Sequence, residues 1–132
     1  MSIKKLPDYR LKQKILYIDK VNPHLLQNYG DMFLEEGFFS DALDFYQKAN
    51  DNSGMQKIKD IAINSGDVML FQQAAKALHL ELKPADWGSI GQKAIDLKKY
   101  LFAQHALERA NNEDLLNSLK KIIQKDVDGK SA

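Results

Sequence analysis

The sequence predicts an all-α protein made of short helices packed as antiparallel hairpins, and three observations predict it. Apolar residues recur at spacings of three and four along most of the 132 residues, which is the period of an amphipathic helix. Proline and glycine are few, and they fall where these stretches begin and end. The chain also aligns with itself at an offset of 61 residues, which indicates an internal repeat.

The apolar stripes give the order of the elements. Near the start, Leu11, Ile15 and Ile18 share one face of a helix expected at about 8–20. The last helix has one apolar side and would cover the end of a stack of hairpins. We therefore expect a single domain over 1–132 with these segments: a basic N-terminal helix within 1–22, three hairpins over about 23–52, 53–83 and 84–112, a capping helix over 113–126, and a flexible tail over 127–132.

Residues that favour helix ends mark the boundaries between these segments. Asn22 can cap a helix that starts at Pro23, where the missing N–H of proline costs nothing. Gly37 and Gly66 suit the left-handed position just after a helix. Capping side chains are also expected at Ser40 or Asp41 and at Asp67.

The offset of 61 residues aligns small or special residues. It pairs Gly30 with Gly91, and it aligns Tyr46 with Leu107 as large side chains. A glycine inside a helix costs up to ~1 kcal/mol relative to alanine, so we expect each to permit the close approach of a second helix. The partners expected across this crossing are Ala42 and Ala103, and the same offset pairs Ala49 with Ala110 and Asn50 with Asn111.

Two segments, LQNYGDMFLEEGFFSDALDFYQKAN and WGSIGQKAIDLKKYLFAQHALERAN, resemble the tetratricopeptide repeat (TPR) family. Leu26 and Trp87 occupy the large apolar position of the pattern, and Phe39 and Tyr100 occupy the turn aromatic. The middle hairpin departs from it, because Phe71 and Leu78 stand where alanine is usual. The resemblance covers about 23–112 and implies a right-handed α-α superhelix of about three antiparallel hairpins, with flanking N-terminal and C-terminal capping helices.

The resemblance also implies a groove lined by the first helix of each hairpin. Family members that grip a peptide carboxylate use Lys and Asn there, whereas this chain has Gln27 and Asp31, so we expect no such clamp. The resulting acidic stripe would favour a basic or neutral polypeptide, although it can equally be a solvated helix face. The positions carried over are Gln27, Asp31, Glu35, Gln56, Asp60, Asn64, Gly88, Gln92 and Asp96.

The residues present argue against catalysis. The chain lacks cysteine, a P-loop, a Gly-x-Ser-x-Gly elbow and a His-Glu-x-x-His helix, so we expect no enzyme, metal or cofactor. His105 is expected to be a partly exposed surface residue, and Trp87 a core anchor. The acids Asp41 and Asp44 lie one turn apart, and the helix dipole alone would account for them.

The leading prediction is therefore an adaptor that binds another protein. We expect it in the cytoplasm, since no apolar run is long enough for a membrane span and no signal peptide is apparent. One alternative is a structural subunit or self-associating scaffold, in which the open ends of the stack pair with themselves or with a larger complex. An exposed ring of Phe38-Phe39 or of Tyr100-Leu101-Phe102 would mark a contact patch for another chain, including a second copy of this one. A net charge of +1 makes nucleic acid a weaker expectation. The remaining alternative is an RNA-associated factor that uses the basic residues Lys4, Lys5, Arg10, Lys12 and Lys14.

Overall fold

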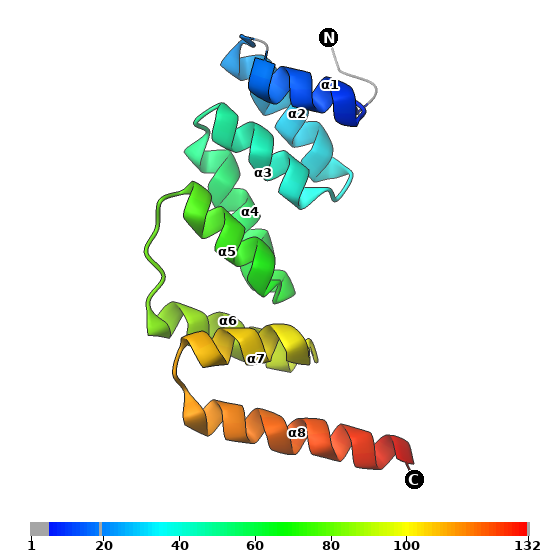
Figure 1. Ribbon diagram of the computed structural model, residues 1–132, viewed down its shortest axis with the longest axis vertical. Coiled ribbons are helices and arrows are strands. Elements are labelled where there is room, and N and C mark those ends of the chain that lie inside the picture. Colours follow the sequence, from blue (N-terminus) through cyan, green and yellow to red (C-terminus); the bar gives the residue numbers. More distant parts are fainter. Residues whose placement is uncertain (1–5, 19, 132) are drawn as a thin grey trace.

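The computed structural model describes residues 6–18 and 20–131, and these residues form helices and the turns between them (Figure 1). No strand occurs in this part of the chain, so the all-α prediction is confirmed. The elements in order are α1 (Tyr9–Gln13), the π-helix η1 (Lys14–Ile18), α2 (Pro23–Glu35), α3 (Phe39–Lys48), α4 (Asn52–Ser65), α5 (Val68–Ala77), α6 (Pro84–Asp96), α7 (Tyr100–Arg109) and α8 (Glu113–Ser131).

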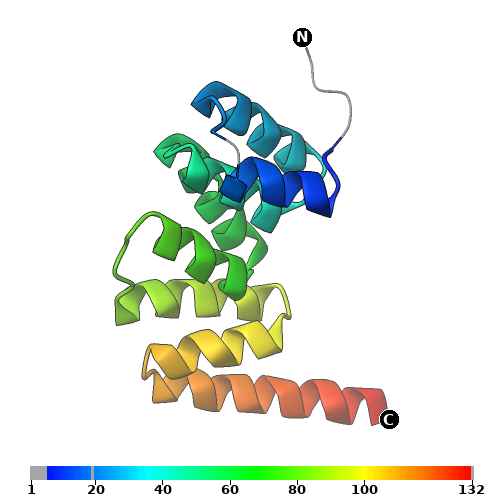
Figure 2. The same cartoon turned by 45° about the horizontal axis from the view of Figure 1, so that its top comes forward.

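The helices pair in sequence and the pairs stack along the molecule. The main packing contacts join α2 with α3, α4 with α5, and α6 with α7. The second helices also pack on one another, α3 on α5 and α5 on α7, while η1 lies against α3 and α8 against α7. As a result α1 and α8 lie at opposite ends of the stack (Figures 1 and 2).

The helix ends follow the expected capping chemistry with one correction. Asn22 accepts a hydrogen bond from the His24 N–H at 2.8 Å, and Asp67 accepts one from the Leu70 N–H at 3.0 Å. The cap expected at Ser40 or Asp41 is wrong, because α3 already begins at Phe39 and has no side-chain cap. Both side chains are used elsewhere: the Ser40 hydroxyl donates to Gln73, and Asp41 binds a lysine.

Left-handed residues end the helices in a repeating way. Gly37 and Gly66 have positive φ angles, as expected, and Lys98 takes the same conformation after α6. Asn50 and Asn111, which the 61-residue offset aligns, both have φ 53° after the second helix of their hairpins. The backbone therefore repeats at the positions where the sequence does.

The glycines inside helices admit large side chains rather than alanines, which corrects the expected pairing with Ala42 and Ala103. A Cβ on Gly30 would lie 2.6 Å from the Tyr46 ring, and one on Gly54 would lie 2.5 Å from the same ring. In the third hairpin a Cβ on Gly91 would lie 2.8 Å from Leu107. Glycine thus opens a hole for a bulky residue of the facing helix, and Ala42 and Ala103 are buried beside this contact rather than forming it.

The core runs through the whole stack and includes the expected anchor Trp87. The C-terminal helix α8 covers its end with Leu115, Leu116, Leu119 and Ile123. This helix continues to Ser131, so the flexible tail expected over 127–132 is helical as far as that residue. A single weak helix former, Gly129, is not enough to end it. None of the helices formed by the described residues has the length and apolarity needed to cross a membrane.

Candidate functional site

The predicted stripe lies on α2, α4 and α6, where most of its side chains are exposed and Gln27 is half-buried. The structure joins Gln56 to Asp60 and Gln92 to Asp96 by amide-to-carboxylate hydrogen bonds of 3.0 Å, each along one helix. These bonds are of the i, i+4 type that steadies a helix surface. The stripe therefore remains a prediction, and its internal contacts are those of an ordinary solvated face.

Asp31 differs from the other stripe residues because it supports the core. The hydroxyl of the buried Tyr46 donates to Asp31 Oδ1 at 2.5 Å. Burial, followed by the bond and charge of Asp31, raises the pKa of Tyr46 well above its ordinary value. A substitution of Asp31 would leave a buried hydroxyl without its acceptor, so this residue cannot report on binding alone.

The structure shows a second surface, a groove over α3 that the sequence did not predict. One pocket of about 390 Å³ lies between η1 and α3, and a second of about 460 Å³ lies between α3 and α5. Asp44 and Gln47 line both pockets, so the two form a pair of adjoining hollows along α3. We call this the α3 groove; its lining residues are Leu16, Tyr17, Ser40, Leu43, Asp44, Gln47, Lys48, Gln73, Lys76 and Ala77.

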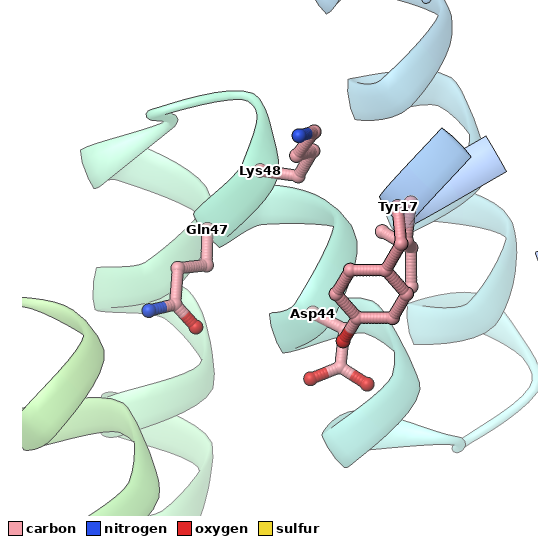
Figure 3. Close-up of a pocket in the computed structure, with 5 residues that line it drawn as sticks. Tyr17, Asp44, Gln47 and Lys48 are labelled. Carbon is pink, nitrogen blue, oxygen red and sulfur yellow. The ribbon is translucent and has the colours of Figure 1, made fainter. Parts of the chain in front are cut away.

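The walls of the α3 groove combine apolar, amide and charged groups. Leu16 and Leu43 are buried and Tyr17 is 69% exposed. In Figure 3, Tyr17 projects over the side of α3 that carries Asp44, whereas Gln47 extends away from Tyr17 and toward α5. The groove can therefore contact an apolar surface, a backbone amide and a charged group of the same ligand.

A buried lysine fixes the N-terminal wall of this groove. The ammonium of Lys12, whose side chain is 11% exposed, binds the carboxylates of Asp41 and Asp44, the latter at 3.0 Å. Burial opposes the charge of Lys12, but its bonds to both carboxylates outweigh this, so its pKa is raised above 10.5. The helix dipole therefore does not account for Asp41 and Asp44, and Lys12 is not available for RNA. The sequence signal for this contact was the net positive charge of residues 1–22 next to the net negative charge of residues 23–64.

The aromatic cluster of the third hairpin confirms two further expectations. Trp87 is buried, with Phe71 and His105 edge-on to its ring and Arg109 over the ring at 5.8 Å. His105 is partly exposed, as expected, although its Nε2 is buried and lacks a hydrogen-bond partner among the described residues. The cluster holds α5, α6 and α7 together.

One exposed ring was expected in each of two aromatic groups: Phe38 is that ring in the first hairpin, whereas in the third hairpin the exposed side chain is Leu101 and not a ring. Phe38 is 51% exposed while Phe39 is half-buried, and Leu101 is 85% exposed between the half-buried Tyr100 and Phe102. Scattered exposed apolar residues are normal. Leu101, however, is far more exposed than Phe38.

The remaining chemistry is sparse in the described part of the chain. It contains no group of three or more His, Asp or Glu side chains placed to hold a metal ion. Comparisons with protein-family models, with curated proteins and with solved structures found no match. The TPR resemblance accordingly stays a resemblance, and the surfaces described above are the features from which a function can be inferred.

Proposed function

We propose that the protein is a non-catalytic module of the cytoplasm that binds a segment of another polypeptide, built as a TPR-like right-handed superhelix of stacked hairpins. The observation that carries the proposal is the α3 groove, which runs from η1 across α3 to α5. It lies on the second helices of the hairpins, and so differs from the groove on the first helices that the resemblance implies.

The chemistry of the groove suits an extended backbone. Gln47 and Gln73 both line it and are exposed, and an amide side chain both donates and accepts hydrogen bonds. Such groups can pair with the alternating N–H and C=O groups of a peptide, Gln73 through its amide NH₂ because its Oε1 already accepts from Ser40. Leu43 and Ala77 provide an apolar floor in the same pocket for the peptide's side chains.

A random peptide library displayed on phage and selected on the full chain tests this proposal. Enriched peptides should bind in fluorescence anisotropy, and the double variant Gln47→Ala with Gln73→Ala should weaken them about tenfold, since two hydrogen bonds of roughly 0.5–1.5 kcal/mol are lost. Gln104→Ala is the matched control, because Gln104 is an exposed amide on α7 that bonds only along its own helix to Glu108. Peptides that bind the double variant as well as they bind the Gln104→Ala control, or a library that yields no binder, would contradict the proposal.

The partner polypeptide could instead bind on the predicted stripe, and a charge reversal distinguishes that site from the α3 groove. Asp60→Lys with Asp96→Lys changes two exposed side chains of the stripe and leaves Asp31 intact. If the selected peptides are basic and lose affinity in this variant only, the partner binds on the stripe, as the sequence predicted. If they lose affinity only in the Gln47 and Gln73 variant, the α3 groove is the site.

Self-association is the second candidate function, and the 85% exposure of Leu101 favours it. A second copy could bury this side chain together with Leu97 or Met69, which are also exposed. Light scattering at several concentrations tests it: a mass above 15.0 kDa that grows with concentration and returns to the monomer in Leu101→Ser would support a self-associating subunit. A constant monomer mass would exclude it.

A further inference from the structure

We infer that the end of the α3 groove under Tyr17 receives an arginine side chain of the bound segment. The inference rests on the proposed function and specifies the partner's chemistry. It joins three features of one pocket of about 390 Å³: an exposed aromatic ring, a partly exposed carboxylate, and a π-helix that places the ring.

The carboxylate of Asp44 can accept a second cation. Asp41 and Asp44 share one ammonium, that of Lys12, so this cluster of three side chains retains one negative charge. The Asp44 side chain is 44% exposed and uses Oδ2 to bind Lys12. Because a carboxylate offers about four acceptor sites, Asp44 keeps acceptor capacity, and the residue lines the pocket.

The ring of Tyr17 lines the same pocket. Tyr17 is 69% exposed, whereas the adjacent Leu16 is 1% exposed, so η1 anchors itself by Leu16 and presents Tyr17 outward. A π-helix is a rare element that is frequent at functional sites. An aromatic face of this kind attracts a cation placed over it.

Arginine fits these two groups better than lysine. Its planar guanidinium stacks on an aromatic face and makes two parallel bonds to a carboxylate, while an ammonium is a strongly hydrated point charge. Lys48 also lines the pocket, and in Figure 3 its side chain rises from α3 away from the Asp44 carboxylate. Its charge weakens the attraction without occupying the site, so a single arginine should bind only in the millimolar range, about −4 kcal/mol.

The test uses the full chain, labelled with ¹⁵N and titrated with the tripeptide acetyl-Gly-Arg-Gly-amide. The comparison ligand has citrulline in place of arginine, which keeps the shape and removes the charge. We expect shifts in the amide signals of Tyr17, Asp44 and Gln47, with the citrulline tripeptide binding about fivefold more weakly.

Two substitutions provide a matched pair, because each removes one of the two carboxylates that hold Lys12. Asp44→Asn should weaken the arginine tripeptide about fivefold, whereas Asp41→Asn, which removes the same charge from a residue that does not line the pocket, should weaken it by a smaller factor. Tyr17→Leu should weaken it by a similar factor. Equal binding of citrulline, equal losses in both asparagine variants, or shifts confined to another surface would overturn the inference.

The outcome also separates this inference from the proposed function. Library peptides that depend on Gln47 and Gln73 but tolerate replacement of every arginine by citrulline would overturn the arginine site and leave the polypeptide-binding function standing. A library without binders, combined with an arginine-specific response of the tripeptide, would overturn the proposed function alone.

Discussion

At the scale of single residues, Tyr46 shows how the stack gains its order. Its ring fits between Gly30 on α2 and Gly54 on α4, and its hydroxyl is fixed by Asp31. A side chain whose ring contacts both glycines and whose hydroxyl is bonded has little freedom to shift. One residue of the first hairpin thereby sets the spacing of three helices.

Added volume at these glycines should therefore be costly. We expect Gly30→Ala or Gly54→Ala to lower the free energy of unfolding by about 1–3 kcal/mol, because the new methyl group would overlap the fixed ring. Gly88→Ala is the control, since a Cβ there meets nothing within 4 Å; it should raise stability by up to ~1 kcal/mol through helix propensity. Urea denaturation measures all three, and equal effects at Gly30 and Gly88 would show that the ring is not fixed.

Lys12 gives a second residue-scale prediction, about alkaline pH. Its folded pKa lies above its ordinary value of 10.5, so its stabilising contribution is complete below that pH and is lost as the pH rises through the folded pKa. Tyr46, whose pKa is also raised, acts in the same direction above its ordinary value of 10.0. Stability should thus fall as the pH rises above about 10.

Replacing the lysine isolates its share of this effect. Lys12→Met should lower the free energy of unfolding by about 1–2 kcal/mol near neutral pH, since two partly exposed carboxylates lose their cation. It should also flatten the decline above about pH 10, whereas Lys14→Met, at an exposed position, should do neither. Thermal unfolding over a pH series measures both, and parallel curves for Lys12→Met and the parent chain would contradict the assignment.

At the scale of elements, the sequence predicted the hairpins and their order because local signals specify them. Apolar spacing, Asn22-Pro23, Gly37 and Gly66 all act within a few residues, and the structure places them at helix boundaries. The shift of Gly37 to Gly66 is 29 residues and that of Gly66 to the left-handed Lys98 is 32. The two spacings differ because the connection between α5 and α6, residues 78–83, is longer than the one between α3 and α4.

The contacts that the sequence did not predict join residues far apart in the chain. The fit of Tyr46 between two glycines and the binding of Lys12 by Asp41 and Asp44 depend on how helices cross, which spacing within one helix does not specify. The α3 groove depends on three elements at once. Its one local signal was Tyr17, which falls off the apolar stripe of Leu11, Ile15 and Ile18.

The helix α8 illustrates an element whose role can be tested by removal. Its apolar side chains cover α7, with Leu119 only 1% exposed, and Tyr100 donates a hydrogen bond to Asp126 at 2.6 Å. A chain ending at Asn112 should therefore expose the last hairpin, bind a hydrophobic dye and aggregate. A chain ending at Asp126 keeps these contacts and should unfold like the full chain; dye binding by both, or by neither, would show that α8 is not a cap.

At the scale of the whole molecule, the stack consists of contacts between neighbours. The first hairpin reaches the third only through the second, since α3 packs on α5 and α5 on α7. In such an array, stability is approximately a sum of unit and interface contributions rather than a property of one centre. A destabilising substitution at one end of the stack should therefore lower stability mainly at that end.

Native-state hydrogen exchange can measure how far such a loss of stability spreads. Leu107 is fully buried in the third hairpin and Phe45 is fully buried in the first, and truncating either to alanine should cost about 2–5 kcal/mol. We expect Leu107→Ala to reduce amide protection mostly in α6, α7 and α8, and Phe45→Ala to reduce it mostly in α2, α3 and α4. Because the two variants truncate fully buried side chains in different hairpins, each serves as the control for the other. A uniform loss of protection in both would mean that the stack unfolds as a single cooperative unit, and the α3 groove would then depend on the distant hairpin as strongly as on its own.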